Sequence, residues 1–317
     1  MPHPRLKFFA EVMGLSPLPE RLRQARTAIL GEEDVPASRA GLSSLAQFRP
    51  RFGPWLWAGR FPVPRKVLVT NLYNHTQTPI EEGWSTKKTQ VRDFRGGQLT
   101  YDSHNGTDMS IPIGTPVLAS APGRVVRVVS EYNRGGLKIV IDHGNNLMTC
   151  TVHLARALVQ VGDVVKRGQP IALSGYSGLD ALITFPWGTP HIHFNVWLNG
   201  VPVDPFPHQG RLSMWRSGRI PEPQTEVTDE VVEPSEVDVS ALDAAIASCR
   251  TESTRRMLSD IETVWERAAA FVMTQNYYPT RFPDLVNPFV RTEERTARLD
   301  LPFSAADVDG LVFIDEV

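Results

Sequence analysis

The sequence predicts a mainly β protein, with an antiparallel β core in the middle of the chain and helical additions at both ends. Three observations lead to this fold class. Short runs of alternating apolar and polar residues, typical of half-buried strands, follow one another between residues 96 and 210. Turn residues, mainly glycine and asparagine, separate these runs. Before and after this region, apolar residues recur at three- and four-residue steps, as they do in amphipathic helices.

The first part of the chain is expected to be helical and irregular. The apolar spacing of residues 18–30 predicts an amphipathic helix, and Gly31 supplies a stop for it. A second short helix is expected after Ser38. Residues 48–57 are rich in tryptophan and proline, and we expect these aromatic rings to pack against the core rather than to bind a ligand. Residues 66–70 then have the composition of a strand.

The middle of the chain contains the predicted β core. The segment 134–136, Arg-Gly-Gly, is a turn signal between two β-branched runs and predicts a hairpin. A loop rich in glycine, proline and aromatic residues follows from Gly175 to Gly188. Because it leads directly into the last strand, we expect it to form one wall of a surface groove. The predicted strands are residues 124–130, 137–142, 147–154, 170–173 and 191–198.

The composition changes after Phe206. Residues 221–238 contain acids and prolines without any Lys or Arg, which predicts an extended, solvated linker. A helical region capped by Ser240 is expected next. Its apolar stripe predicts a core or a docking face, and a protein partner is one candidate for that face. The stripe consists of Leu242, Ile246, Cys249, Leu258, Ile261, Trp265, Ala268 and Val272.

Four segments follow from these patterns. We expect an N-terminal helical and irregular extension at 1–95, a β domain at 96–210, an acidic, proline-rich linker at 211–239 and a C-terminal helical extension at 240–317. The 317 residues and a hydrophobic content of 41% are enough for one large or two smaller domains.

Two histidines in the last predicted strand give the first indication of a functional site. Residues 191–198 alternate strictly, with Ile192, Phe194, Val196 and Leu198 on one side and His191, His193, Asn195 and Trp197 on the other. If the aliphatic side faces a core, both imidazoles project together from the opposite side. There they are close enough to share a metal ion or a metal-bound water.

Two further segments supply more donor groups. His104 and Asp108 flank an Asn-Gly pair, which favours a tight turn that brings both side chains toward one point. In the alternating run 147–154, His153 is expected to point away from the core together with Thr149 and Thr151. The core side of that run is expected to carry Met148, Cys150, Val152 and Leu154. Histidines and an aspartate are a donor set that zinc accepts.

These residues belong to motifs that occur in a fixed order. The motifs are His-x-x-x-Asp at 104–108, His153-Leu154, Gly-Asp-x-Val-x-x-Gly-Gln at 162–169 and His-x-His-Phe at 191–194. In this respect the chain resembles the lysostaphin-type (LytM-like) zinc endopeptidases, which cut peptide cross-links in bacterial cell walls. The resemblance runs from about Tyr101 to Phe206, a third of the chain.

The resemblance implies a fold, a cofactor and individual roles. The fold it implies is an antiparallel two-sheet core of the duplicated hybrid motif type. His104, Asp108 and His193 would hold one zinc ion, and His153 and His191 would act as catalytic partners beside the bound water. Three protein ligands leave a position open on zinc for water, which the metal activates to attack a peptide bond. The implied substrate is a peptide, most of all the cross-links or stem peptides of peptidoglycan.

Two other functions compete with the peptidase. One is a non-catalytic regulatory module, zinc-binding or zinc-free, that recognises peptidoglycan. Since zinc binding needs only the three ligands, the presence of His153 and His191 disfavours it. Residues 162–172 also resemble the turn of biotinyl and lipoyl carrier domains, but no hairpin with a Met-flanked lysine lies nearby. Two positions depart from the family pattern: Thr151 stands where tyrosine is frequent, and Asn195 where an acidic residue is common.

The remaining features narrow the range of partners. A net charge of −2 gives no basic field for nucleic acid. No apolar run approaches the ~18 residues of a membrane helix, and Glu11 interrupts the short apolar N-terminus, so no span and no signal peptide are expected. The implied family works in the cell envelope or outside the cell, and the sequence leaves the compartment open.

The remaining histidines and the cysteines are expected to lie outside the site. His143 is expected to be structural, and His3, His75 and His208 show no partner pattern. Cys150 and Cys249 are expected to be buried free thiols.

Overall fold

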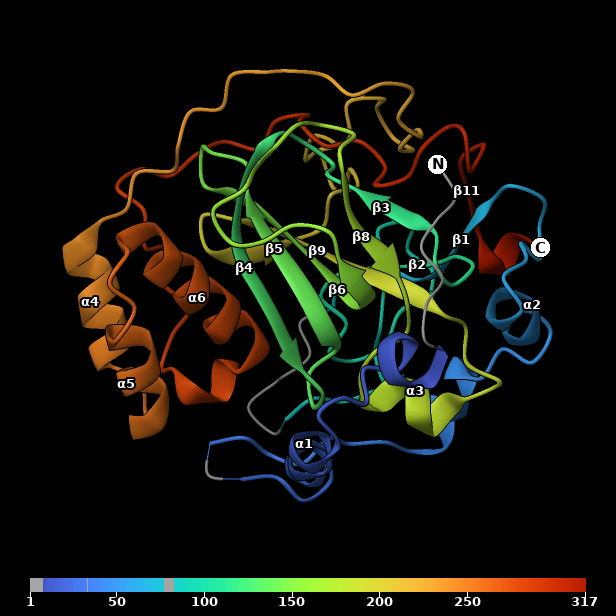
Figure 1. Cartoon of the computed structure of the whole chain (residues 1–317), viewed down its shortest axis with the longest axis horizontal. Helices are drawn as coiled ribbons and strands as arrows, with labels where there is room; N and C mark the ends of the chain where they lie inside the picture. Colours follow the sequence, from blue (N-terminus) through green and yellow to red (C-terminus); the bar gives the residue numbers. More distant parts are fainter. Residues whose placement is uncertain (1–7, 33, 77–82) are drawn as a thin grey trace.

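A computed structural model of the chain describes residues 8–32, 34–76 and 83–317. It shows a mixed α and β protein built around one large, mostly antiparallel network of strands, with three C-terminal helices gathered on one side (Figure 1). Among the described residues, no helix is both long and apolar enough to cross a membrane. The predicted antiparallel β core with helices at both ends is confirmed at this level.

Eleven strands form the network. The main path runs β11-β1-β2-β9-β6-β5-β4-β7, and every pair on it is antiparallel except β1 with β11. The strands are β1 (Val67–Asn71), β2 (Thr107–Ser110), β3 (Pro116–Leu118), β4 (Gly123–Glu131), β5 (Gly136–Asp142), β6 (Leu147–Ala157), β7 (Val164–Val165), β8 (Pro170–Ser174), β9 (His191–Leu198), β10 (Val201–Val203) and β11 (Leu311–Phe313). All the strands predicted from the sequence are present, and β4 and β5 form the predicted hairpin.

Strand β6 forks the network. Its first half, residues 147–152, pairs with β9, whereas its second half, from Leu154 onward, pairs with β8. Strand β5 accompanies β6 along its other edge. Because β8 also pairs with β3, these two strands branch from the main path immediately after His153.

The helices are shorter and more numerous than the sequence suggests. They are α1 (Leu18–Leu30), α2 (Gly53–Trp57), α3 (Leu179–Thr184), α4 (Val239–Ala247), α5 (Glu252–Ser259) and α6 (Val264–Tyr277), with short turns at Phe8–Val12, Leu42–Gln47, Pro279–Arg281 and Ile314–Glu316. The predicted helix at 18–30 is confirmed, and it ends at Gly31 with a φ of 75°. The second helix expected after Ser38 is instead a 3₁₀ turn.

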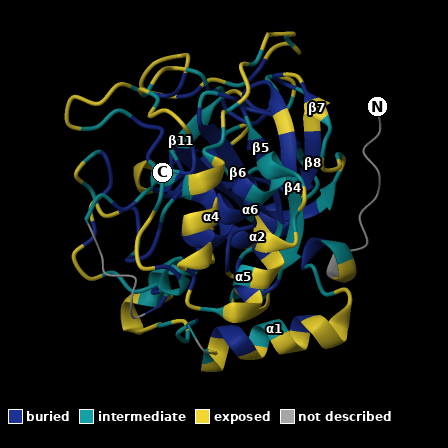
Figure 2. Cartoon of the chain, turned by 90° about the vertical axis from the view of Figure 1, so that its left-hand side faces the viewer, coloured by how far each residue is buried: buried dark blue, intermediate teal, exposed yellow. Residues whose placement is uncertain are grey.

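The strand network is buried on both faces. On one side lies the inner core, which includes Val69, Met109, Ile139, Phe194 and Trp215. On the other side lies the outer core, where Met148, Cys150, Val152 and Trp197 pack against the C-terminal helices. The predicted stripe from Leu242 to Val272 faces this outer core, and α6 appears almost entirely buried in Figure 2. The stripe is therefore a docking face that the chain's own sheet fills.

Two expectations about the C-terminal part need correction. The cap of α4 is Asp238 rather than Ser240, because the Asp238 carboxylate accepts a hydrogen bond from the Ala241 amide at 2.9 Å and Ser240 already lies inside the helix. The acidic segment 221–238 is irregular, as expected, but it is not solvated throughout. Arg167 binds Glu230 at 2.6 Å and so attaches the segment to the β domain.

Candidate metal centre

The centre is built on two neighbouring strands. Asp108 of β2 and His193 of β9 are direct cross-strand partners, so their side chains leave the same face of the sheet. His104 lies in the turn just before β2. Gly106 in that turn has no room for a side chain, since a Cβ atom there would lie 2.7 Å from His193 Nε2. The Asn-Gly turn therefore lets the His193 ring pass close over the backbone, and it brings all three residues together as predicted.

Three donor atoms converge in this arrangement. Asp108 Oδ1 lies 2.7 Å from His193 Nδ1 and 3.0 Å from His104 Nε2, and the two imidazole nitrogens are 3.1 Å apart. Donors at 2.0–2.1 Å from one tetrahedral ion lie roughly 3.3–3.4 Å apart, so the triad fits such an ion after separating by a few tenths of an ångström. Among the described residues, this is the one group of three such side chains able to share a metal ion.

Neighbouring residues set the orientation of the donors. The Leu72 carbonyl accepts a hydrogen bond from His104 Nδ1 at 2.7 Å, which leaves Nε2 as the nitrogen with a lone pair. Asn71 Nδ2 donates to Asp108 Oδ2 at 2.8 Å and leaves Oδ1 for the centre. Asn71 in turn contacts Gln47 of the N-terminal extension at 3.1 Å. Nothing in the sequence pattern singled out Asn71, because it appears there only as the end of a strand.

His153 and His191 lie beside the triad. Their rings are 4.8 Å apart, and His191 Nε2 lies 3.6 Å from Asp108 Oδ1. Each donates Nδ1–H to a backbone carbonyl at 2.8 Å, His153 to Ser177 and His191 to Thr189. Both rings therefore turn the acceptor nitrogen Nε2 away from those carbonyls. All five predicted site residues come together in one cluster.

A backbone irregularity brings His153 to this cluster. Strict alternation would place His153 on the face opposite Val152, yet Val152 is the cross-strand partner of His193. His153 has a φ of 60°, and the pairing of β5 with β6 shifts register at this point, which is a β-bulge. The bulge returns His153 to the face of His193. As a second consequence, Leu154 enters the inner core rather than joining Met148, Cys150 and Val152, so the predicted face of Leu154 is wrong.

Burial and mutual contact shape the protonation of the cluster. Burial alone would raise the pKa of Asp108, but the imidazoles of His104 and His191 hold it well below its usual range. Burial and the neighbouring His191 lower the pKa of His153 well below its ordinary value. Burial also lowers the pKa of His193, although Asp108 opposes this shift. These shifts favour an ionised Asp108 and neutral imidazoles at His153 and His193. An ionised carboxylate and a neutral imidazole are the forms that bind a metal.

Comparison with known proteins finds a family model that matches the part of the chain containing this cluster. Residues 102–205 match the model of peptidase family M23. Residues 102–205 are called the M23 domain below, after the family model that they match. Its limits agree with the resemblance from about Tyr101 to Phe206 predicted from the motifs.

Relatives of the M23 domain are found among characterised and uncharacterised proteins. A metalloprotease of Haemophilus influenzae is 37% identical over 146 residues, which cover 46% of this chain and 26% of that protein. The peptidoglycan DD-endopeptidase ShyA of Vibrio cholerae is 44% identical over 101 residues, 32% of this chain and 22% of that protein. The chain therefore spans about a quarter of the length of these two relatives.

Solved structures include similar proteins as well. The catalytic domain of lysostaphin from Staphylococcus simulans is 33% identical, covering 32% of this chain and 75% of that chain with a TM-score of 0.27. A zinc-containing peptidase from Vibrio cholerae is 29% identical, covering 46% of this chain and 41% of that chain with a TM-score of 0.30.

The loop between β8 and β9 borders the centre of the M23 domain. It contains α3, and Tyr176 at its start lies with its ring 4.9 Å from that of His191. Asp180, at the beginning of α3, approaches His153 Nε2 to 3.9 Å and is more than half exposed. Further along, Leu182, Ile183, Phe185 and Trp187 are exposed apolar residues. The loop therefore lies beside the centre, and its role as a groove wall at 175–188 stays a prediction.

The other histidines and the cysteines take no part in the centre. His143 is fully buried, with both ring nitrogens hydrogen-bonded, as expected of a structural residue. His75 binds Asp204 at 2.6 Å and stacks on His208, a contact that the sequence did not predict. His3 lies outside the described residues. Cys150 and Cys249 are free and buried, as expected.

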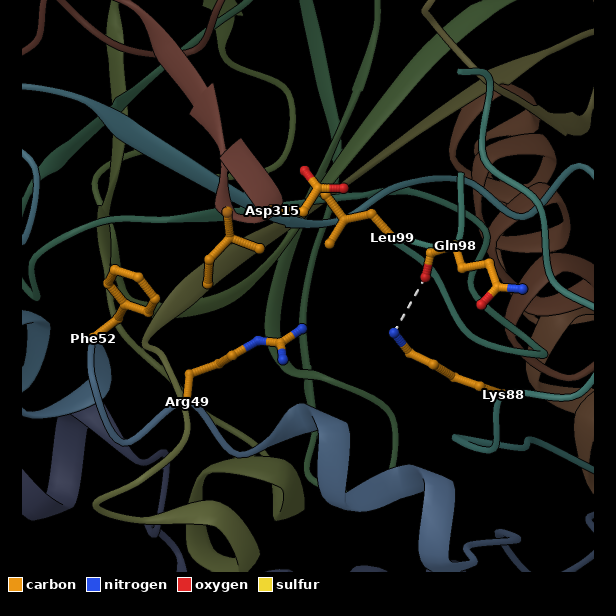
Figure 3. A pocket seen from close by; sticks show the side chains of 7 residues that line it. Arg49, Phe52, Lys88, Gln98, Leu99 and Asp315 are labelled. Atoms are coloured by element: carbon orange, nitrogen blue, oxygen red, sulfur yellow. Dashed lines mark hydrogen bonds between the residues drawn. The ribbon is translucent and has the colours of Figure 1, made fainter. Parts of the chain in front are cut away.

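A separate cavity of about 360 Å³ is lined by Arg49, Phe52, Lys88, Gln98, Leu99, Ile314 and Asp315. Figure 3 shows the side chains of Arg49 and Lys88 pointing into it from opposite sides, below Asp315. Asp315 is already bound by Arg95 at 2.7 and 3.0 Å, and the Lys88 ammonium donates to the Gln98 carbonyl at 3.2 Å. None of the five clustered site residues lines this cavity.

Proposed function

We propose that the protein is a zinc-dependent endopeptidase that hydrolyses peptide bonds of bacterial peptidoglycan by a metal-activated water. The observation that carries this proposal is the convergence of His104 Nε2, Asp108 Oδ1 and His193 Nδ1 within 3.1 Å of one another, with two more imidazoles beside them. The M23 match over the same residues supports it.

We assign His104, Asp108 and His193 as the ligands of one zinc ion. The donor set of two imidazoles and one carboxylate suits zinc, and it leaves a position open for water or substrate. Zinc bound there lowers the pKa of water and polarises a carbonyl. Asp108 offsets part of the metal charge, while the Leu72 carbonyl and Asn71 hold His104 and Asp108 in the orientation that binding requires.

We assign His153 and His191 as the catalytic residues. Each leaves Nε2 available because its Nδ1–H is committed to a backbone carbonyl. Such a nitrogen can accept a proton from the attacking water, and in its protonated form it can donate to the developing oxyanion or to the leaving amine. The depressed pKa of His153 keeps it ready as an acceptor at neutral pH.

The peptidoglycan substrate rests on relatives. ShyA and ShyB of Vibrio cholerae are named peptidoglycan DD-endopeptidases, at 44% and 43% identity over 101 residues. The branching of β3 and β8 from β6 agrees with a two-sheet, duplicated hybrid motif core at 96–210. The extension at 1–95, the linker at 211–239 and the helical extension at 240–317 complete the proposed division of the chain. We assign no nucleic-acid partner.

One experiment tests the enzyme against the binding module. Zinc content of the purified full chain is measured together with release of soluble fragments from bacterial cell walls, with and without a chelator. Near-stoichiometric zinc and chelator-sensitive release are expected. Zinc without release would favour the non-catalytic regulatory module, for which a murein hydrolase activator, EnvC of Escherichia coli, is a relative at 39% identity over 99 residues. A protein without zinc would refute the peptidase and leave a zinc-free binding module as the remaining candidate.

A further inference from the structure

The face of β9 that carries the metal centre continues under the C-terminal helices. His193, Asn195 and Trp197 alternate along this face. Trp197 is fully buried in the outer core, and its ring lies 6.2 Å from that of Tyr277 at the end of α6. The helical extension therefore covers β9 four residues beyond a proposed zinc ligand.

A chain of hydrogen bonds joins the two regions. Tyr277 Oη donates to Asn195 Oδ1 at 2.7 Å. Asn195 Nδ2 donates at 2.9 Å both to the Asn105 carbonyl and to Asn105 Oδ1. Asn105 directly follows His104, so the chain runs from α6 through the middle of β9 to the ligand turn. Tyr277 and Asn195 are both buried, which shields these bonds from competition by water.

The tyrosine hydroxyl fixes which way the Asn195 amide faces. An asparagine side chain can turn over and exchange its oxygen and nitrogen. With Tyr277 donating to Oδ1, the NH₂ group must face Asn105. Without that hydroxyl, Oδ1 loses its donor in a buried site, and the turned-over amide would set one oxygen against another. A carboxylate at position 195 would meet the same repulsion from Asn105.

We propose that Tyr277 of the C-terminal extension is a positioning residue for the metal centre, acting through Asn195 on the turn that holds His104. The extension then helps to orient a metal ligand, in addition to packing on the outer core. This inference rests on the zinc site assigned above. Residue 277 lies outside the M23 match at 102–205.

Tyr278 supplies a matched control. It follows Tyr277 directly, and both tyrosines are 6% exposed. Its hydroxyl bonds to Glu131 Oε1 at 3.2 Å and to Asn133 at 3.3 Å, away from the ligand turn. Tyr277→Phe and Tyr278→Phe therefore remove the same atom from the same helix end and leave both rings in place.

The test measures zinc affinity of the full-length variants by competition with a chromophoric chelator. We expect Tyr277→Phe to weaken zinc binding by about tenfold or more, in the range of other residues that orient metal ligands, and Tyr278→Phe to bind as the wild type does. Asn195→Ala should weaken binding at least as much, and the double variant Tyr277→Phe, Asn195→Ala should lose no more than Asn195→Ala alone. Equal effects of the two tyrosine variants, or none, would overturn the proposal.

A second measurement separates this inference from the proposed function. Hydrogen–deuterium exchange of residues 101–108 is followed in metal-free protein. Faster exchange in Tyr277→Phe than in Tyr278→Phe supports the positioning role even if the wild type binds no zinc, a result that would overturn the peptidase alone. Equal exchange in the two variants counts against the positioning role.

Discussion

His143 and the histidines of the metal centre are all largely buried imidazoles, yet the protein holds them in different ways. Both nitrogens of His143 are committed, Nδ1 to the Pro122 carbonyl and Nε2 to Thr149 Oγ1, each at 2.8 Å. In His104, His153 and His191 a backbone carbonyl takes only Nδ1, and Nε2 is left for chemistry. Burial alone therefore does not mark a functional histidine. The distinguishing feature is one fixed nitrogen and one directed toward the other site residues.

The largest effects are expected from the three proposed ligands. Replacing His104, Asp108 or His193 with Ala should remove zinc and lower cell-wall hydrolysis by about 10³-fold or more, because the metal supplies several kcal/mol of transition-state stabilisation. Metal content and fragment release measured on the same preparations check this. Full zinc occupancy in any of these variants would remove that residue from the ligand set.

The two catalytic candidates should separate activity from metal binding. His191→Ala and His153→Asn are expected to lower turnover by about 10²–10⁴-fold while zinc stays bound. Asn is chosen at 153 because it tolerates the positive φ that this position requires. Chelator competition and turnover are measured side by side. Zinc loss in either variant would mean that the roles within the cluster are assigned incorrectly.

A smaller effect is expected from replacing Asn71, which orients a proposed ligand but does not itself bind the metal. Asn71→Ala removes the donor to Asp108 Oδ2 and should weaken zinc binding by about 10–100-fold, with activity restored at high zinc. A titration of activity against free zinc measures this shift. An unchanged zinc requirement would show that Asp108 holds its orientation without Asn71.

His143 should behave in the opposite way. His143→Gln is expected to lower the free energy of unfolding by about 1–3 kcal/mol, because Pro122 O or Thr149 Oγ1 loses its partner in a buried site. Zinc affinity and turnover of the folded variant should be unchanged. Denaturant unfolding tests the change in stability, and the cell-wall assay tests turnover. A loss of bound zinc would show that His143, like the site histidines, contributes to metal binding.

Acid titration provides the subtlest test. Burial lowers the pKa of His143 to about 3 in the folded protein, whereas an unfolded histidine titrates near about 6.5. The unfolded state therefore binds more protons between these values, and the free energy of unfolding decreases as the pH falls from about 6.5 toward 3. Compared with the wild type, His143→Gln should show a shallower decrease over this range. Identical slopes would show that His143 does not contribute to acid sensitivity.

The sequence predicted the five site residues but not the means by which they meet. The motifs and the alternation of β9 were sufficient for His191 and His193, since Ile192 and Phe194 do face the inner core. At His153 the same rule gives the wrong face, because a bulge is a backbone property that side-chain periodicity does not carry. Asn71 and Tyr277 were missed for another reason. Each forms a hydrogen bond to a residue far away in sequence, and no local sequence pattern predicts such a contact.

The helical additions illustrate the same limit. Their apolar stripe could be recognised in the sequence, but the surface that it covers could not. In the structure the stripe covers Met148, Cys150, Val152 and Trp197 of the sheet. The acidic segment was correctly expected to lack regular structure. Its attachment through Arg167 depends on a cation from another part of the chain, which composition within the segment does not reveal.

The fork in β6 has a consequence for how such a protein can evolve. The loop between Ser174 and His191 connects strands on either side of the fork, and its ends are fixed by β8 and β9. Residues added to or removed from its middle, including α3, leave the pairing of both strands intact. Insertions in this one loop can therefore change the surface beside the centre while the strands that carry Asp108 and His193 keep their pairing.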